Sequence, residues 1–271
     1  MSLFPSLDGF EPTRQTLHNY ANAIGVVPRT HAAFHPQWWH ISLRITERGL
    51  KTAVMPLPDG QNVWLEMDLR HHNVLLQTSY GGTQAFSMAA GWTGTEMGER
   101  VLTAVADLGL SGTYAREKFE SDEPRPYDPA QAETFFTALT HAQRIFADHR
   151  ATLTGSMGPI QVWPHGFDLA FEWFGTRVER HEEHGDVKEL PSQINLGFYP
   201  GDDPYFYSNS WPFEADQLLD KPLPAGAAWH TEGWQGSMLP YRELVNDENA
   251  ASRLQDYAQA VFDLASQALL V

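Results

Sequence analysis

The sequence predicts an α+β fold made of two antiparallel β-meanders, each flanked by helices. Short segments of alternating apolar and polar residues recur about every 8–12 residues and are separated by turn sequences, which is typical of antiparallel strands. Amphipathic helical patterns precede and follow each group of strands. The order helix, strands, helix therefore occurs twice, and an internal duplication with pseudo-twofold symmetry is a further hypothesis.

The first half is expected to begin with a helix that starts at Pro12-Thr13 and stops at Gly25. Residues 28–36 are predicted as a loop. Strands are then expected near residues 38–46, 50–56, 62–69, 73–79 and 83–88. A helix capped by Thr93 or Thr95 should close this half near Leu108.

The second half is expected to open with a helix that has Asp128 as its N-cap and Pro129 in its first turn. Strands are predicted near residues 159–163, 167–174, 193–199, 204–210, 227–231 and 236–240. A charged loop is expected from Arg177 to Pro191, and a last helix from about Asp247 to Leu269.

We interpret residues 1–271 as one compact unit. The two half-repeats would span residues 12–118 and 128–269, joined by an acidic, proline-rich connection at residues 119–128. A loose alignment supports the repeat, because Trp39–Ile45 can be laid on Phe167–Trp173.

The chain is strongly acidic, with 18 Lys and Arg against 34 Asp and Glu and a net charge of −16. Such a surface repels phosphate backbones, so we expect no nucleic-acid partner and no binding to an anionic membrane. Cysteine is absent, which excludes disulfides, thiolate metal sites and cysteine nucleophiles. With neither a membrane-length apolar run nor a signal-peptide pattern, the sequence favours a cytoplasmic location. It leaves the oligomeric state open.

The segment around the first predicted strand supplies the first candidate site residues. Trp39, Ile41, Leu43 and Ile45 would face a core, whereas Trp38, His40, Ser42 and Arg44 would share the opposite face. That face is either an ordinary solvated sheet surface or the wall of a polar pocket. Trp38 favours the pocket, because a large ring is seldom left on a fully hydrated face.

The repeat alignment adds acidic partners to this face. It places His40 opposite Asp168 and Arg44 opposite Glu172, so carboxylates would raise the pKa of His40 unless desolvation dominates. His165, between Pro164 and Gly166, is a further candidate. The predicted ligand-binding residues are Trp38, His40, Arg44, His165, Asp168 and Glu172, and no catalytic residue is assigned.

No metal site and no cofactor are predicted. His31, His35 and His40 have no spacing that fixes a common ligand geometry. His181-Glu182-Glu183-His184 is either a metal site or, as we favour, a solvated run of charges. The sequence contains no nucleophile-elbow, Walker A or dinucleotide-binding motif.

Several short motifs resemble those of an uncharacterised bacterial domain-of-unknown-function family. They are Trp38-Trp39-His40, Phe167-Asp168-Leu169-Ala170 and Gly197-Phe198-Tyr199-Pro200-Gly201, where Tyr199 replaces an expected tryptophan. The resemblance covers about residues 12 to 268. It implies a bacterial type of protein and brings no activity, substrate or catalytic residue.

The leading functional hypothesis is the binding of a small polar ligand in a cleft between the two sheets. One alternative is a hydrolase of the carbohydrate or amide class that uses His and Asp or Glu. The other is a structural or partner-binding protein without a ligand. A cleft in which a carboxylate touches a histidine would favour the hydrolase, and a closed, filled seam would favour the structural role.

Overall fold

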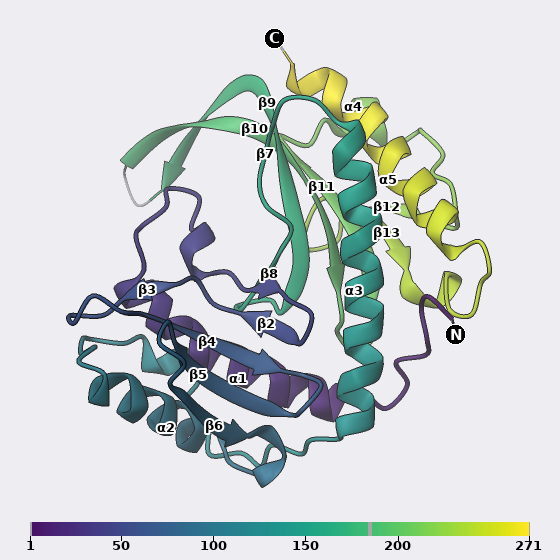
Figure 1. Cartoon of the computed structure of the whole chain (residues 1–271). Coiled ribbons are helices and arrows are strands. Elements are labelled where there is room, and N and C mark those ends of the chain that lie inside the picture. Colours follow the sequence, from purple (N-terminus) through teal and green to yellow (C-terminus); the bar gives the residue numbers. More distant parts are fainter. Residues whose placement is uncertain (1, 184–185, 271) are drawn as a thin grey trace. The chain divides into compact units, whose positions relative to one another are not determined.

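The computed structural model describes residues 2–183 and 186–270, which form two antiparallel sheets and the helices that pack on them (Figure 1). This confirms the α+β class and the two antiparallel sheets. Contacts group the chain into two compact units. The N-terminal unit comprises Leu7–Phe136 and Gln161–Asp168, and the C-terminal unit comprises Met1–Ser6, Thr137–Ile160 and Leu169–Val271. The pseudo-twofold duplication and the half-repeats stay predictions.

The sheet of the N-terminal unit is a meander with the strand order β1-β2-β4-β5-β6, and β3 pairs with β4. Its strands are β1 (Arg44–Ile45), β2 (Gly49–Lys51), β3 (Met55–Pro56), β4 (Asn62–Asp68), β5 (Asn73–Thr78) and β6 (Thr83–Ser87). Gly49 allows β2 to approach β4 closely, because a Cβ at this position would lie 1.8 Å from the carbonyl oxygen of Met67.

Helices α1 (Glu11–His31) and α2 (Gly94–Asp107) pack against each other and against this sheet (Figure 1). Each buries an apolar stripe, with Leu17 and Ile24 from α1 and Val101 and Val105 from α2 all fully or nearly fully buried. Burial of one such side chain contributes about 1.5–3 kcal/mol. Short 3₁₀ helices complete the unit: η1 (Trp39–Ile41), η2 (Met88–Ala90) and η3 (Arg116–Lys118). Strand β8 (Gln161–Trp163) also belongs to this unit.

The sheet of the C-terminal unit has the strand order β12-β13-β11-β10-β9-β7. These strands are β7 (Ser156–Met157), β9 (Asp168–Glu183), β10 (Asp186–Tyr199), β11 (Tyr205–Trp211), β12 (Ala228–His230) and β13 (Gly236–Pro240). Helix α5 (Ala250–Ser266) packs on β10 and β11. The shorter helices are α4 (Ala215–Leu218), η4 (Tyr241–Glu243) and η5 (Gln267–Leu269).

Aromatic rings form the centre of the C-terminal unit. Phe206 stacks on Phe198 with ring centroids 5.0 Å apart, and Phe4 packs edge-on to Phe206 at 5.3 Å. Phe146 of helix α3 (Pro129–Thr152) reaches the same cluster, 6.2 Å from Phe206. Among the described helices, none combines the length and the apolar character that a membrane span requires.

Helix α1 does not stop at Gly25, as predicted from the sequence, but continues through Gly25 and Pro28 to His31. Gly25 allows a close approach instead: a Cβ there would lie 3.2 Å from Cγ of Pro164. Tertiary packing therefore outweighs the local helix-stop pattern, and half of the predicted loop 28–36 is helical.

The predicted strand over residues 38–46 is wrong in its first half. Trp38 has φ 59°, in the left-handed region, and Trp39–Ile41 form a 3₁₀ helix. The hydroxyl of Ser42 lies 2.8 Å from the carbonyl oxygen of Trp39 and 2.6 Å from Oε1 of Gln161, and its single hydrogen is shared between these acceptors. The contact with Trp39 gives that carbonyl a partner that a strand ladder would otherwise provide, and only Arg44 and Ile45 pair as strand β1.

The charged loop predicted from Arg177 to Pro191 is also wrong, because the described residues of this segment, 177–183 and 186–191, form the ends of strands β9 and β10. The register pairs Val178 with Pro191 and Glu182 with Val187. Val178 and Val187 are 57% and 54% exposed, so the ribbon lacks the alternating burial by which a strand is recognised in a sequence. His184 of the charged run lies outside the described residues.

The N-terminus of α2 offers a test of the local folding rules. The Thr93 side chain accepts the backbone N–H of Glu96, and the Glu96 carboxylate accepts the N–H of Thr93, which makes a complete capping box. Thr93→Ala should therefore lower the free energy of unfolding by about 1 kcal/mol, measured by urea denaturation. Thr103→Ala is the matched control in the same helix, where the exposed threonine should be replaced without loss. Equal stabilities of the two variants would contradict the role of the cap.

Candidate functional site: a basic recess on helix α1

A small recess that is open to solvent lies within the N-terminal unit, between α1, η1, η3 and the loop after β8. Four of its lining residues carry polar side chains: Asn22, Arg29, Lys118 and His165. The others are Gly25, Val26, Ile41 and Pro164. The recess thus combines an apolar floor with nitrogen-bearing groups, and its lining includes neither a carboxylate nor a hydroxyl side chain.

Helix α1 supplies one wall of the recess through its periodicity. Asn22, Gly25, Val26 and Arg29 follow the spacing i, i+3, i+4 and i+7, which places them on one face of the helix. Val26 is buried, whereas Asn22 and Arg29 are half-buried. Arg29 belongs to this face only because the helix continues beyond Gly25.

The loop after β8 supplies the opposite wall and is anchored at both ends. Val162 exchanges two backbone hydrogen bonds with Leu43, of 2.8 and 2.9 Å. Phe167 is fully buried against Phe135 and has φ 55°, a strained conformation for a bulky residue. Between these anchors the loop presents Pro164 and His165 to the recess.

His18 of α1 attaches this loop to the helix. Its Nε2 lies 3.1 Å from the carbonyl oxygen of His165, and its ring stacks on Phe167 at 5.8 Å. Burial lowers the pKa of His18, and the positive charge of Arg14 lowers it further. The ring is therefore neutral near pH 7, and Nε2 carries the hydrogen that it donates to the carbonyl.

The recess concentrates positive charge that acidic groups do not neutralise. Within the described residues, no carboxylate lies at ion-pair distance from Arg29 or Lys118, although the neighbouring Arg116 pairs with both Glu99 and Glu120. The guanidinium of Arg29 instead lies 5.1 Å from the ring centroid of Trp38. A cation–π contact of this kind orients the guanidinium without cancelling its charge.

Trp38 and His40 form the rim of the recess beside Arg29. Their rings stack at 5.5 Å, and Nδ1 of the buried His40 accepts the backbone N–H of His35 at 3.2 Å. Burial lowers the pKa of His40, with further lowering by Arg29 and His35. The expectation that carboxylates raise this pKa is therefore wrong, because desolvation and nearby positive charge dominate. The left-handed backbone of Trp38 costs on the order of 1–3 kcal/mol.

A comparison with known protein families shows to which family the chain belongs. A family of unknown function matches residues 4–269, almost the whole described length. The chain belongs to the DUF5996 family. The predicted resemblance to a domain-of-unknown-function family is thereby confirmed at the level of the family. Neither a curated protein nor a solved structure matches the chain.

In this DUF5996 protein, one of the six predicted site residues, His165, lines the recess. Trp38 lies next to it through its contact with Arg29, and His40 stacks on Trp38. Arg44 lies further along the chain, and its Nη1 donates to Oε1 of Gln161 at 2.7 Å. The predicted pairing of His40 with Asp168 and of Arg44 with Glu172 stays a prediction.

Sequence reasoning missed Asn22, Arg29 and Lys118. The helical spacing of Asn22 and Arg29 was visible in the sequence, but ending the helix at Gly25 assigned Arg29 to a loop. Lys118 lies on η3, directly before the segment interpreted as the connection, and it meets α1 only in the folded unit. A longer helix would have revealed two of the three residues.

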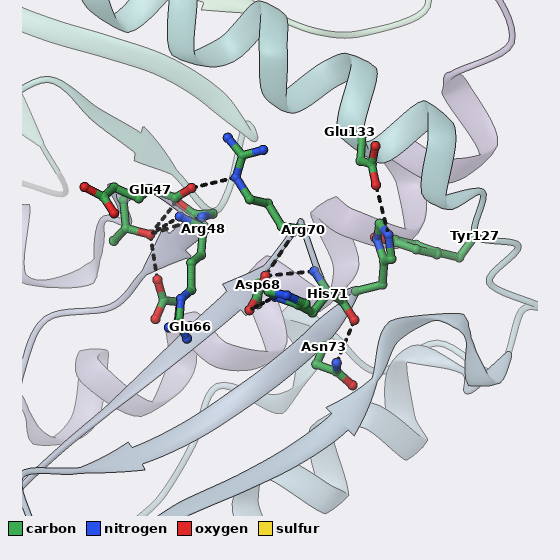
Figure 2. A network of polar contacts seen from close by, with 12 residues as sticks. Glu47, Arg48, Glu66, Asp68, Arg70, His71, Asn73, Tyr127 and Glu133 are labelled. Atoms are coloured by element: carbon green, nitrogen blue, oxygen red, sulfur yellow. Dashed lines mark hydrogen bonds and ion pairs between the residues drawn. The ribbon is translucent and has the colours of Figure 1, made fainter. Parts of the chain in front are cut away.

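A second cluster of polar residues surrounds the turn between β4 and β5 (Figure 2). Oδ1 of the buried Asp68 accepts the backbone N–H groups of Arg70 and His71, and Oδ2 lies 2.9 Å from Nδ1 of His71. A carboxylate paired with a histidine is an arrangement that also serves acid–base catalysis. Because its two oxygens are engaged by backbone amides and by the His71 ring of the same turn, we interpret the Asp68 carboxylate as holding this turn.

The rest of this network also ties structural elements together. Glu66 accepts the Thr46 hydroxyl at 2.6 Å, and Arg70 donates to the carbonyl oxygen of Glu47 at 2.8 Å. Nδ1 of His72 lies 2.9 Å from the hydroxyl of Tyr127. In the described parts of the chain, no group of three or more His, Asp or Glu residues is arranged to hold a metal ion.

The role of Asp68 can be tested through pH. Burial alone would raise its pKa, but hydrogen bonds from the His71 ring and from two backbone amides hold the pKa below its ordinary value of 3.8. A carboxyl group with a lowered folded pKa adds stability above its unfolded pKa, and this stability is lost as the pH falls through the folded value. Asp68→Asn should lower the free energy of unfolding by about 1–3 kcal/mol at pH 7, and the difference should shrink below about pH 4.

The measurement is urea denaturation of both proteins between pH 3 and pH 7. Asp59→Asn is the matched control, because Asp59 also accepts a backbone N–H in a turn of the same sheet but is exposed. The structural role of Asp68 would be refuted by a difference that stays constant with pH, or by a loss no larger than that of the control.

Proposed function

We propose that this DUF5996 protein binds a small anionic ligand, a carboxylate or a phosphate, in the recess of its N-terminal unit. The observation that carries the proposal is the pair of cations at the recess, Arg29 and Lys118, for which the described residues provide no carboxylate partner. In a chain with a net charge of −16, such a pair is conspicuous. It is the arrangement expected where a ligand supplies the missing negative charge.

The chemistry of the lining supports an anion. The guanidinium of Arg29 offers a planar pair of donors that matches the two oxygens of a carboxylate or phosphate, and the ammonium of Lys118 adds a second charge. The amide of Asn22 provides a further neutral donor. Val26 and Ile41 supply the apolar surface that most ligand sites also contain.

The small size of the recess supports a small ligand. It encloses far less space than the roughly 300–1,000 Å³ typical of pockets for drug-sized molecules, so only a small group such as a carboxylate or a phosphate would enter it. This proposal keeps the small polar ligand and the cytoplasmic location expected from the sequence but assigns the ligand to one unit. Binding is favoured over hydrolysis, because the lining contains neither a hydroxyl nor a carboxylate side chain.

Thermal unfolding of the full chain tests the proposal. Sodium phosphate and sodium acetate are compared with sodium chloride at equal ionic strength. A ligand at ten times its Kd adds about 1.4 kcal/mol, which should raise the Tm by roughly 3–6 °C. Arg29→Gln should remove this shift, and Lys118→Gln should reduce it.

Arg100→Gln is the matched control, because Arg100 lies over the ring of Trp92 at 4.2 Å, away from the recess, and resembles Arg29 in this respect. It should keep the full shift. Two results would refute anion binding at this site: no shift with either anion in the unchanged protein, or an equal shift in Arg29→Gln and Arg100→Gln.

A further inference from the structure

Two exposed aromatic rings lie beside the recess, on the segment between α1 and η1. The side chain of Phe34 is 67% exposed and that of Trp38 is 45% exposed, and their rings meet edge to face at 5.6 Å. Large apolar side chains exposed side by side are a frequent mark of a binding surface, whereas a single one is ordinary. Tyr80 is such a single case: it is 82% exposed, and no other ring among the described residues contacts it.

The local structure holds these rings in place. Trp38 keeps its position through a left-handed backbone conformation and by stacking on the buried ring of His40. Phe34 packs edge to face on the same His40 ring at 5.3 Å. The backbone N–H of His35 in turn fixes His40. A strained backbone segment that several packing contacts hold in place is typical of ligand-binding sites.

One residue, Arg29, connects the exposed rings with the basic recess. Arg29 lines the recess and also lies 5.1 Å from the ring centroid of Trp38. An anion bound at Arg29 would therefore carry any attached group toward Trp38 and Phe34. A bare inorganic anion would leave both rings exposed to water.

This inference rests on the proposed function. We propose that the ligand is an anion that carries an aromatic ring, with its acidic group at Arg29 and Lys118 and its planar ring against Phe34 and Trp38. Aromatic carboxylates, aryl phosphates and nucleotides all combine an acidic group with a planar ring. Stacking on an aromatic side chain tolerates many ring types, so the rings select for planarity and the cations for charge.

Isothermal titration calorimetry of the full chain with four probes tests this inference. Phenyl phosphate is compared with inorganic phosphate, and benzoate with acetate, so that each aryl anion has a partner without a ring. In one of the two pairs, the probe with the ring should bind about tenfold more tightly than its partner without a ring. This is the advantage expected of one stacked ring. The acid that shows the advantage identifies the ligand as a phosphate or a carboxylate.

Phe34→Leu is the decisive variant, because Phe34 is exposed and does not contact Arg29. It should reduce the aryl advantage and leave the affinity for inorganic phosphate or acetate unchanged. Trp38→Leu should also reduce the aryl advantage, but because Trp38 lies over Arg29 it should weaken the binding of inorganic phosphate or acetate as well. Tyr80→Leu, which removes an exposed ring elsewhere in the same unit, should change nothing.

The possible results distinguish the inference of an aromatic ligand from the proposal of anion binding on which it rests. If aryl and simple anions bind equally well, or if the aryl advantage survives both Phe34→Leu and Trp38→Leu, the aryl ligand is refuted and anion binding stands. If none of the four probes binds the unchanged protein, anion binding itself is refuted.

Discussion

The close approach of the loop after β8 to helix α1 is the contact on which the candidate site depends. Gly25 makes it possible by leaving out a Cβ that would crowd Pro164, and the neutral ring of His18 secures it with a hydrogen bond to the carbonyl oxygen of His165. The loop is distant from α1 in the sequence, yet it belongs to the same compact unit. Without this contact, His165 and Arg29 would not share a recess.

Electrostatics explains why the recess differs from the rest of this acidic chain. Several arginines of the N-terminal unit have acidic or carbonyl partners: Arg14 pairs with Glu11, and Arg70 bonds the backbone of Glu47. Arg29 is held by an aromatic ring instead, which keeps its full charge. A positive site on a negative surface also resists occupation by large polyanions, because the surrounding charge repels them while a small anion can still enter.

Backbone strain marks the same region. Trp38 and Phe167 are bulky residues at positive φ, and they lie on the two segments that frame the recess. Each is kept there by packing: Trp38 on His40 and Phe167 between His18 and Phe135. Part of the packing energy of the unit therefore offsets the backbone strain of these two segments. The turn at Asp68 differs from these two segments. Its carboxylate accepts hydrogen bonds from two backbone amides and lies beside the His71 ring, and we expect it to stabilise the fold.

The sequence by itself determined the features that depend on near neighbours. Alternation over a few residues predicted the two antiparallel sheets, and the caps at Thr93 and Asp128 predicted the starts of α2 and α3, because each involves groups within four residues of one another. The tertiary structure decided the rest. Only the folded unit packs Pro164 against Gly25, places the Ser42 hydroxyl beside Gln161 and brings Lys118 to Arg29. These contacts join residues far apart in the chain, and a local pattern carries no information about such distances.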